Sequence, residues 1–460
     1  MKKIAGTVML ILMLSLFTGC GGGNDNAGGG GNDGAGSGGT ASIAISPMTK
    51  TIIAGESVEL TVTVQNTSII WPTNVQGTFT QSNNTAIWTP PKVEGIYDFT
   101  VTSPAGVSVT ARITVVWPDP TIAVYPEKVI VDEGTTFRFL AEVETMDEQP
   151  VPTVTWEITG NCGALDGDGR FQAINTGTCS IKAIVHGSDG KAISATAEVT
   201  VLESSYVLID HPTSIHTYVA GINSSGVIVG TYSGYDQKIR GFLKDGSEYT
   251  TLEYPGAEAT YVEAISDSGL LAGSFDDADG FVHGFMKDAV GYTVVDHPDS
   301  DETLVWDIDD SGLLAGDFYD LTQGRYRGFL KDGNTWEPVD YPEATHTFVT
   351  RMGGEGVVVG YFIDIEGWCH GFVKDAEGYR TIDHPASRYT ELWSINTAGM
   401  IIGNHIDIDG QMFGFMKDGD EWEVIGYPDA EATYVSDMDE SGQVVGYFVD
   451  ANGFYHGFMK

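Results

Sequence analysis

The chain has 460 residues, and its 64 Asp and Glu against 23 Lys and Arg give a formal net charge of −41. This charge argues against nucleic acid and anionic membrane surfaces as partners, because both would repel the chain. The hydrophobic content of 42% is too high for a disordered protein. The length corresponds to about two to four domains at ~100–200 residues each.

The N-terminus has the pattern of an export signal. Two lysines precede an apolar run over 4–17, which has signal-peptide length and is too short to span a membrane comfortably. The run leads into Phe-Thr-Gly-Cys at 17–20, which resembles the lipobox of bacterial lipoproteins, in which the cysteine is acylated. The resemblance implies a signal peptide over 1–19, a lipid on Cys20 and anchoring at the outer membrane or cell surface. An ordinary signal peptide with a coincidental cysteine is the other interpretation.

A tether is predicted over 20–40, from the lipidated cysteine onward. After Cys20 the segment is nearly all Gly, Asn, Asp, Ala and Ser, so it cannot bury a core. We expect it to behave as a flexible coil between the lipid and the first domain.

Two small β domains are predicted next, over 41–117 and 118–203. Both contain β-branched runs such as 58–64, separated by turn residues at regular spacing, which is typical of a β-sandwich. Pro118 and Pro120 cannot continue a central strand, so the boundary between the domains is placed there. We expect both domains to act as spacers.

The second of these domains resembles bacterial Ig-like domains. The similarity lies in a strand with Trp156, a Gly-Arg-Phe-Gln-Ala stretch at 169–173 and a Gly-Thr-Cys-Ser-Ile stretch at 177–181. Cys162 and Cys179 fall inside the domain, and in an exported chain we expect them to form a disulfide. A metal site is the other interpretation, which the lack of nearby histidines disfavours.

From residue 206 the chain becomes periodic. A Gly-Phe pair followed by an apolar residue and a lysine recurs every 43 or 44 residues, at Phe242, Phe285, Phe329, Phe372, Phe415 and Phe458. Each unit holds four short β runs joined by glycine-bearing turns, which is the content of a propeller blade. The last unit lacks its fourth run, and an unmatched run at 206–210 precedes the first. The sequence therefore predicts an all-β chain that ends in a closed six-bladed β-propeller over 204–460, with the N-terminal strand completing the last blade.

These units resemble the HAF-type extracellular repeats of bacteria. Ile-Asn-Ser-Ser-Gly-Val-Ile-Val-Gly at 222–230 is similar to one motif of that family. His-Gly-Phe at 283–285, 370–372 and 456–458 is similar to a second motif, with Gly in place of Ala. The resemblance implies an exported propeller and brings no established activity.

Ring residues before the repeated prolines alternate between His and Tyr, which implies a two-blade unit of about 86 residues repeated three times. The histidines are His211, His297 and His384. Each follows an aspartate on the predicted acidic loop face, so they could bind a ligand or do acid–base work. Packing is favoured, because a residue before proline is extended and side chains of adjacent extended residues point apart.

Positions that break the repeat are the better candidates for ligand binding, since a residue fixed in every blade holds the blade. On the innermost strand these positions hold Glu263, Trp306, Asp307, Arg351, Trp393 and Asp437. Tryptophan, arginine and carboxylates near a central pocket suit a carbohydrate, through apolar stacking and a few placed polar groups. Packing of the tryptophans between blades is the alternative.

A calcium-loop spacing occurs at Asp307, Asp309 and Ser311 before a glycine, and again from Asp437. The twelfth position of each is a phenylalanine where a bidentate glutamate is needed, so a hairpin turn is favoured. No metal site, cofactor or catalytic residue is predicted, and calcium at these turns stays the alternative. No nucleotide, zinc or hydrolase motif occurs, but this does not exclude a lyase or hydrolase, because propeller sites are assembled from separate blades.

The sequence thus predicts a lipid-anchored monomer that displays a propeller for binding a polysaccharide or a protein partner. One alternative is a glycan lyase or glycosidase that uses histidines and carboxylates of the acidic face. Another is a structural surface protein without a small ligand. A role without catalysis is favoured.

Overall fold

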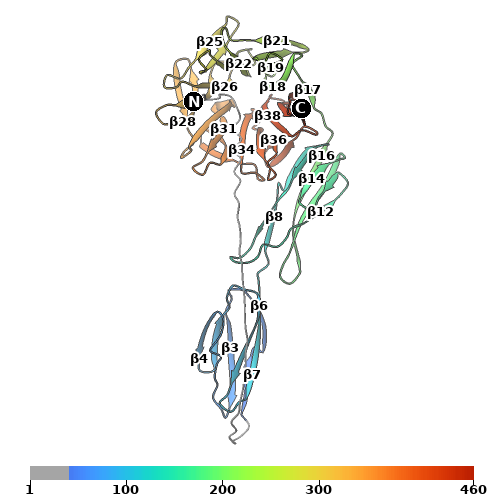
Figure 1. Ribbon diagram of the computed structural model, residues 1–460, viewed down its shortest axis with the longest axis vertical. Coiled ribbons are helices and arrows are strands. Elements are labelled where there is room, and N and C mark those ends of the chain that lie inside the picture. Colours follow the sequence, from blue (N-terminus) through green and yellow to red (C-terminus); the bar gives the residue numbers. More distant parts are fainter. Residues whose placement is uncertain (1–40) are drawn as a thin grey trace. The chain divides into compact units, whose positions relative to one another are not determined.

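The computed structural model describes residues 41–460, whose regular elements are strands apart from the 3₁₀ turn η1 (Gly354–Gly356) (Figure 1). Within that range no helix is long and apolar enough to cross a membrane. The predicted signal peptide, Cys20 and the tether lie outside the described residues. Two compact units are present: residues up to Ile122 with Val143–Val154 and Ile184–Ser194, and Ala123–Glu142 with Thr155–Ala183 and Ala195–Lys460. The second predicted sandwich therefore contributes to both.

The first predicted sandwich consists of two sheets, with strand orders β1-β3-β5-β4 and β2-β7-β6. Its strands are β1 (Ser42–Ser46), β2 (Thr49–Ile53), β3 (Val58–Gln65), β4 (Thr78–Ser82), β5 (Thr85–Thr89), β6 (Gly95–Thr102) and β7 (Ser108–Val116). Residues of β3 alternate between buried and exposed, as expected for a strand with one face on a core. That core contains Leu60, Trp88, Phe99 and Ile113.

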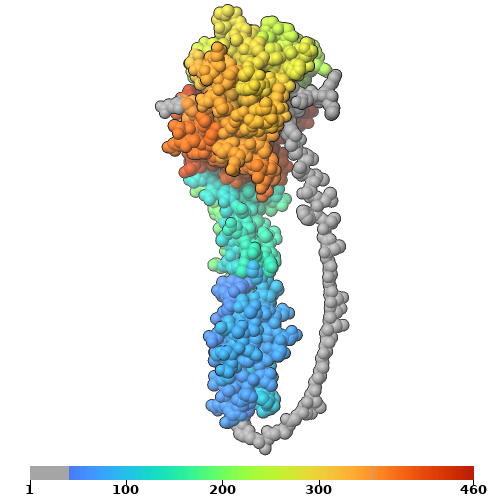
Figure 2. Space-filling view, turned by 90° about the vertical axis from the view of Figure 1, so that its left-hand side faces the viewer, coloured from blue at the N-terminus to red at the C-terminus, as the bar shows by residue number. Residues whose placement is uncertain are grey.

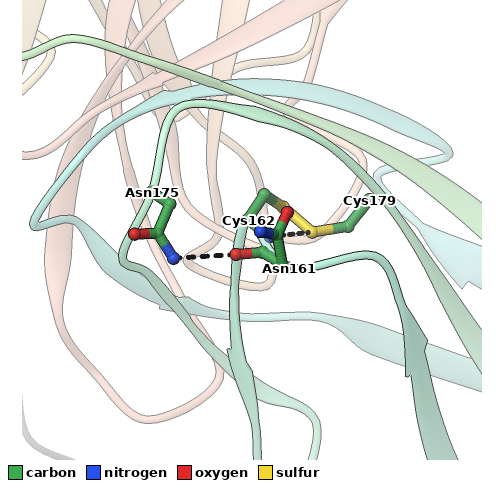
Figure 3. The surroundings of a disulfide bond; sticks show 4 residues. All are labelled: Asn161, Cys162, Asn175 and Cys179. Carbon is green, nitrogen blue, oxygen red and sulfur yellow. Dashed lines mark hydrogen bonds between the residues drawn. A yellow bond between two sulfur atoms is a disulfide. The ribbon is translucent and has the colours of Figure 1, made fainter.

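The second predicted sandwich contains the disulfide. Its strands are β8 (Thr121–Tyr125), β9 (Lys128–Asp132), β10 (Thr136–Arg138), β11 (Leu140–Glu144), β12 (Thr155–Thr159), β13 (Gly163–Leu165), β14 (Arg170–Ala173), β15 (Gly177–His186) and β16 (Ala192–Leu202). Cys162 and Cys179 are buried and bonded, with their Cα atoms 5.8 Å apart (Figure 3). Beside them the side-chain amide of Asn175 donates to the carbonyl of Asn161 at 2.8 Å (Figure 3).

Each repeat unit forms a four-stranded antiparallel sheet, the blade of a β-propeller (Figure 1). Blades 1 to 3 are β18 (Ser214–Ile222), β19 (Ile228–Gly234), β20 (Ile239–Asp245), β21 (Glu248–Leu252); β22 (Ala259–Ile265), β23 (Leu271–Asp276), β24 (Val282–Lys287), β25 (Tyr292–Val295); and β26 (Thr303–Ile308), β27 (Leu314–Asp320), β28 (Arg325–Asp332), β29 (Thr335–Val339). Blades 4 to 6 are β30 (His346–Met352), β31 (Val358–Ile363), β32 (Cys369–Asp375), β33 (Gly378–Ile382); β34 (Thr390–Ile395), β35 (Ile401–Ile406), β36 (Met412–Asp418), β37 (Glu421–Ile425); and β38 (Ala432–Met438), β39 (Val444–Val449), β40 (Tyr455–Met459), β17 (Val207–Ile209).

The predicted N-terminal strand is part of the sixth blade. β17 pairs antiparallel with β40, with Leu208 opposite Phe458. The first strand of each blade, here called the inner strand, contacts the inner strands of both neighbouring blades, and β38 contacts β18. Figure 2 shows neighbouring blades, coloured yellow to orange, packed side by side on one face of the propeller.

One threonine at the start of each inner strand fixes the segment that enters it. Its Oγ1 accepts the backbone N–H of the ring residue six positions earlier, at 2.9 to 3.1 Å in every blade. The threonines are Thr217, Thr260, Thr303, Thr347, Thr390 and Thr433. The predicted role of fixed residues, to hold the blade, is therefore met here.

Every inner strand carries a register shift, or β-bulge, three residues after this threonine. A glycine on the second strand lies opposite the bulge in each blade: Gly230, Gly273, Gly316, Gly360, Gly403 and Gly446. A Cβ on any of them would lie 2.0 or 2.1 Å from a carbonyl oxygen of the inner strand. The glycine of the repeat motif is thus required by close backbone approach.

Replacing Gly316 with alanine should therefore destabilise the propeller by about 1–3 kcal/mol, the usual cost of overpacking. The added Cβ would lie 2.0 Å from the carbonyl oxygen of Leu304, which is backbone and cannot rotate away. Gly291→Ala is the matched control, because a Cβ there meets nothing within 4 Å. Denaturant unfolding of both variants measures the difference, and equal midpoints would contradict this account of the motif.

The second predicted sandwich and the propeller share one sheet within the second unit. β9 pairs in parallel with β37, the outer strand of blade 5, which produces an eight-stranded sheet. Lys460 bonds to Asp132 of β9 at 2.9 Å and also to Glu423 of β37. The hydroxyl of Thr135 donates to the carbonyl of Gly426 at 3.0 Å. Blade 5 is therefore the blade that contacts the second predicted sandwich.

Candidate functional site

The bulge residues of the six inner strands form one level of the propeller, here called the bulge level. They are Ala220, Glu263, Trp306, Thr350, Trp393 and Ser436. A bulge leaves its extra residue out of the strand ladder and re-aims its side chain. Ala220, Glu263, Trp306 and Trp393 each keep part of their surface exposed, so solvent reaches this level. The predicted ligand residues Glu263, Trp306 and Trp393 are thus brought to one level by the same irregularity.

Trp306 and Trp393 contact each other although they come from blades 3 and 5. Their ring centroids lie 5.8 Å apart at an interplanar angle of 87°. The indole N–H of Trp306 donates to Asp317 at 2.6 Å, and that of Trp393 donates to Glu391 at 3.1 Å. With both N–H groups satisfied, the exposed surface that remains is ring face and edge.

Asp307, Arg351 and Asp437 are not free to bind a ligand, which corrects the prediction. One residue beyond the bulge level, Arg351 bonds to Asp307 at 2.9 Å and to Asp437 at 3.0 Å. All three are buried. Burial lowers the pKa of Arg351, but the two carboxylates outweigh it and the pKa is raised. These residues form an ion network that joins blades 3, 4 and 6.

Further bonds extend this network to the remaining atoms of the carboxylates. Asp307 accepts the N–H of Met352 at 2.8 Å. Asp437 accepts the N–H of Ile222 at 3.0 Å and the hydroxyl of Ser394 at 2.9 Å. Blades 1 and 5 are thereby included, so the network links five of the six blades and its carboxylates are bonded within the protein.

Glu263 is in a different situation, because its carboxyl accepts no hydrogen bond from any residue between 41 and 460. Burial raises its pKa to about 7, opposed by the charge of Arg351. Because Glu263 keeps part of its surface exposed and its carboxyl is not bonded by the protein, a ligand can donate to it.

Aromatic rings that the sequence analysis did not select surround the same axis. Two residues before the bulge, the inner strands hold the half-exposed Tyr218, Tyr261, Leu304, Phe348 and Tyr434, and the buried Glu391. Tyr361 and Tyr447 on second strands contact them, with centroid distances of 4.7 Å to Phe348 and 4.8 Å to Tyr434. Their spacing from the bulge residues, two positions along a strand, was the signal that could have identified them.

His211, His297 and His384 have the packing role that was favoured for them. Their rings stack on Tyr232, Phe318 and His405 at centroid distances of 3.6 to 3.7 Å. Burial is the main cause that lowers the pKa of all three. Each lies in a separate blade within such a stack, so the structure does not bring them together.

The aspartates that precede these histidines pair with other side chains. Asp296 bonds to His283 at 3.1 Å, Asp383 to His370 at 2.8 Å, and Asp210 to His456 at 2.8 Å. Each of these histidines lies on a third strand and faces a second carboxylate on its other side. The aspartates therefore fix the blade edges and do not form acid–base pairs with their sequence neighbours.

The turns with calcium-loop spacing are hairpin turns. Asp309 accepts the N–H groups of Ser311 and Leu313 at 2.9 Å, and its partner in spacing, Asp307, is held by Arg351. The carboxylates therefore do not converge on one point. No group of three metal-ligating side chains occurs in the described part of the chain.

A cavity of about 170 Å³ lies in blade 3 beside His297, Arg327, Trp336 and Pro338. In blade 4 the hydroxyl of Tyr341 bonds to that of Thr381. In blade 3 the equivalent positions hold His297 and Pro338, respectively. Neither a phenol nor a threonine hydroxyl therefore fills this space.

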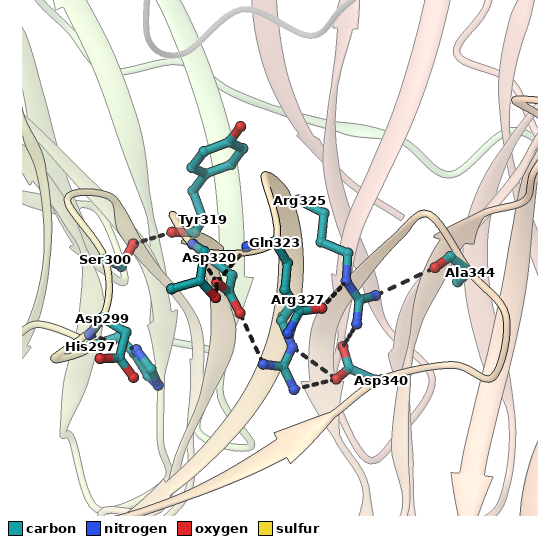
Figure 4. Close-up of polar contacts among 11 residues, drawn as sticks. His297, Asp299, Ser300, Tyr319, Asp320, Gln323, Arg325, Arg327, Asp340 and Ala344 are labelled. Atoms are coloured by element: carbon teal, nitrogen blue, oxygen red, sulfur yellow. Dashed lines mark hydrogen bonds and ion pairs between the residues drawn. The ribbon is translucent and has the colours of Figure 1, made fainter.

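The cation that lines the cavity is already paired. Figure 4 shows Arg327 between Asp320 and Asp340, at 3.0 and 2.6 Å. The cavity is therefore explained by a local departure from the repeat, and Arg327 offers a ligand no free positive charge there.

No protein-family model matches the sequence, and no curated protein matches it. Solved structures with a similar fold include the fucose-specific lectin of Aleuria aurantia, with 12% identity over 54% of this chain and 93% of that chain and a TM-score of 0.38. AofleA from Arthrobotrys oligospora has 12% identity over 56% and 86%, with a TM-score of 0.38. TolB from Acinetobacter baumannii has 11% identity over 61% and 59%, with a TM-score of 0.33. An Aleuria structure is described as a six-bladed β-propeller. These likenesses concern the fold and say nothing about a ligand of this chain.

Proposed function

We propose that the propeller binds a carbohydrate at its axis, on the bulge level. The observation that carries the proposal is the pair Trp306 and Trp393, half-exposed, in contact, and with both indole N–H groups already bonded. Aromatic faces of this kind pack against the C–H faces of sugar rings, and a carboxyl such as that of Glu263 accepts a sugar hydroxyl. Two of the six residues of the level carry large rings, whereas Ala220 and Ser436 are its smallest side chains.

The same proposal includes the setting of the site. The chain is exported and anchored through a lipid on Cys20, with a tether to 40, Ig-like spacers over 41–117 and 118–203, and a monomeric six-bladed propeller over 204–460 closed by β17. The pairing of β17 with β40 supports the closure. An enzyme that uses His211, His297 or His384 is less well supported, because their rings are committed to stacking.

Two variants test the site on the full chain against a broad glycan array, with calorimetry on the best binder. Trp306→Ala with Trp393→Ala should abolish binding, since it removes the ring faces. Ala220→Trp should also abolish binding, because it places a third large ring at the equivalent position, in the space proposed for the ligand. This substitution removes no existing contact. Trp368→Ala is the control, as Trp368 is 44% exposed on a loop of blade 4. Unchanged binding in both folded variants would exclude this site.

A further inference from the structure

Glu263 is the one ionisable side chain among the six bulge residues. It lies in blade 2, between the small Ala220 of blade 1 and the ring of Trp306 in blade 3. Since its part-exposed carboxyl has no hydrogen-bond donor in the described part of the chain, a ligand at this level meets an acceptor that the protein leaves open.

The nearest cation, Arg351, acts on this carboxyl through its charge but donates no hydrogen bond to it. Both terminal nitrogens of Arg351 are taken, one by Asp307 and one by Asp437. Two further carboxyls lie beside the tryptophans, Asp317 and Glu391. The inner strands and these partners thus supply five carboxyl groups against a single guanidinium, so carboxyl groups outnumber cations around the bulge level.

A second observation also indicates missing donors. Asp317 is fully buried, and its Oδ2 has no partner, although its Oδ1 accepts the N–H of Trp306. Burial raises the pKa values of Asp317, Glu391 and Asp437 as well as that of Glu263. Aromatic faces together with unpaired carboxyls are the surroundings that bind an ammonium group, by cation–π attraction and charge-assisted hydrogen bonds.

We propose that the axis site selects amino sugars, with the free ammonium group of the sugar bonded to the carboxyl of Glu263 and its ring packed on Trp306 and Trp393. The inference rests on the carbohydrate-binding function proposed above and specifies its ligand class. Uronic and sulfated sugars are excluded, because the site offers them no free cation and the chain carries a formal charge of −41. Neutral sugars would leave the carboxyl without an ionic partner.

The test compares two oligosaccharides of equal length and linkage, glucosamine oligomers and N-acetylglucosamine oligomers, by calorimetry near neutral pH on the full chain. The wild type should bind the free amine about tenfold more tightly, a modest value for a close charge pair. Glu263→Gln, which keeps the shape and removes the charge, should abolish this preference. Glu248→Gln should keep it, because it makes the same charge change on an exposed outer strand.

The outcomes separate the inference from the function on which it rests. If both oligosaccharides bind equally, or if the preference persists in Glu263→Gln, the amine inference is wrong and the carbohydrate site survives. If no glycan binds, both are wrong. A preference that Glu248→Gln reduces as strongly as Glu263→Gln, and that added salt removes, indicates attraction by the acidic surface as a whole and overturns the assignment to Glu263.

Discussion

Replacing Arg351 with methionine should lower the free energy of unfolding of the propeller by about 3–5 kcal/mol, the usual cost of breaking a buried ion pair. The change leaves Asp307 and Asp437 buried without their shared cation. Methionine fills much of the volume, so the loss measures charge more than packing. Denaturant unfolding near neutral pH is the measurement, with the transition of the propeller followed by tryptophan fluorescence.

Two controls make this result specific. Arg380→Met should leave the transition unchanged, because Arg380 pairs with Asp375 on the exposed outer part of blade 4. The loss in Arg351→Met should shrink in acid, since burial raises the pKa of Asp437 and its protonation removes an unpaired charge. A loss that is the same at both pH values would show that packing, and not the ion network, accounts for the role of Arg351.

The repetition of the sequence made the propeller predictable because it reflects contacts inside one blade. The six repeated phenylalanines are all at most 1% exposed, and the repeated threonines bond within their own blades. The predicted role of His211, His297 and His384 in packing was also accessible, since their alternation with tyrosine showed that a flat ring suffices. Such features need only local spacing.

Contacts between blades could not be predicted in the same way. Arg351 meets Asp307 and Asp437, which lie 44 and 86 residues away along the chain (351 − 307 and 437 − 351), across the axis. Their types suggested a ligand site, and only the geometry shows that the charges satisfy one another. The bulge likewise could not be read from the inner strand, because its residue differs from blade to blade. Only the glycine opposite it recurs in every blade.

The contact of the second predicted sandwich with blade 5 was visible in the sequence only as a departure of that blade from the repeat. Third strands of the other blades hold Arg or His between carboxylates, whereas blade 5 has Phe413 there and Gly426 in place of the acid. Asp409 of this blade is paired instead with Arg138 at 2.6 Å, and also with Arg170. The departure from the repeat marks the place, but the sequence does not show which segment covers it.

Replacing Glu263 with glutamine should make the propeller more stable at alkaline pH and leave it unchanged in acid. The pKa of Glu263 is about 7 against an ordinary 4.5, so the folded state holds this proton more tightly than the unfolded chain. That advantage is complete below pH 4.5 and is lost as the pH rises through about 7. The difference of 2.5 between the two values (7 − 4.5) corresponds to at most about 3 kcal/mol, and less for a side chain with some exposed surface.

This expectation connects stability with binding. Measured by denaturant unfolding, the gain in Glu263→Gln should be about 1–3 kcal/mol at about pH 8.5 and near zero at about pH 4, whereas Glu248→Gln should show no such dependence. A glucosamine oligomer should raise the stability of the wild type near neutral pH, because its ammonium group supplies a partner for the ionised carboxyl, and should do so much less for Glu263→Gln. A carboxyl that destabilises the free protein and is relieved by its ligand is what a binding residue in an apolar site looks like. If the variant gains no stability at alkaline pH, the Glu263 carboxylate does not destabilise the free protein, and this argument for an ammonium ligand is wrong.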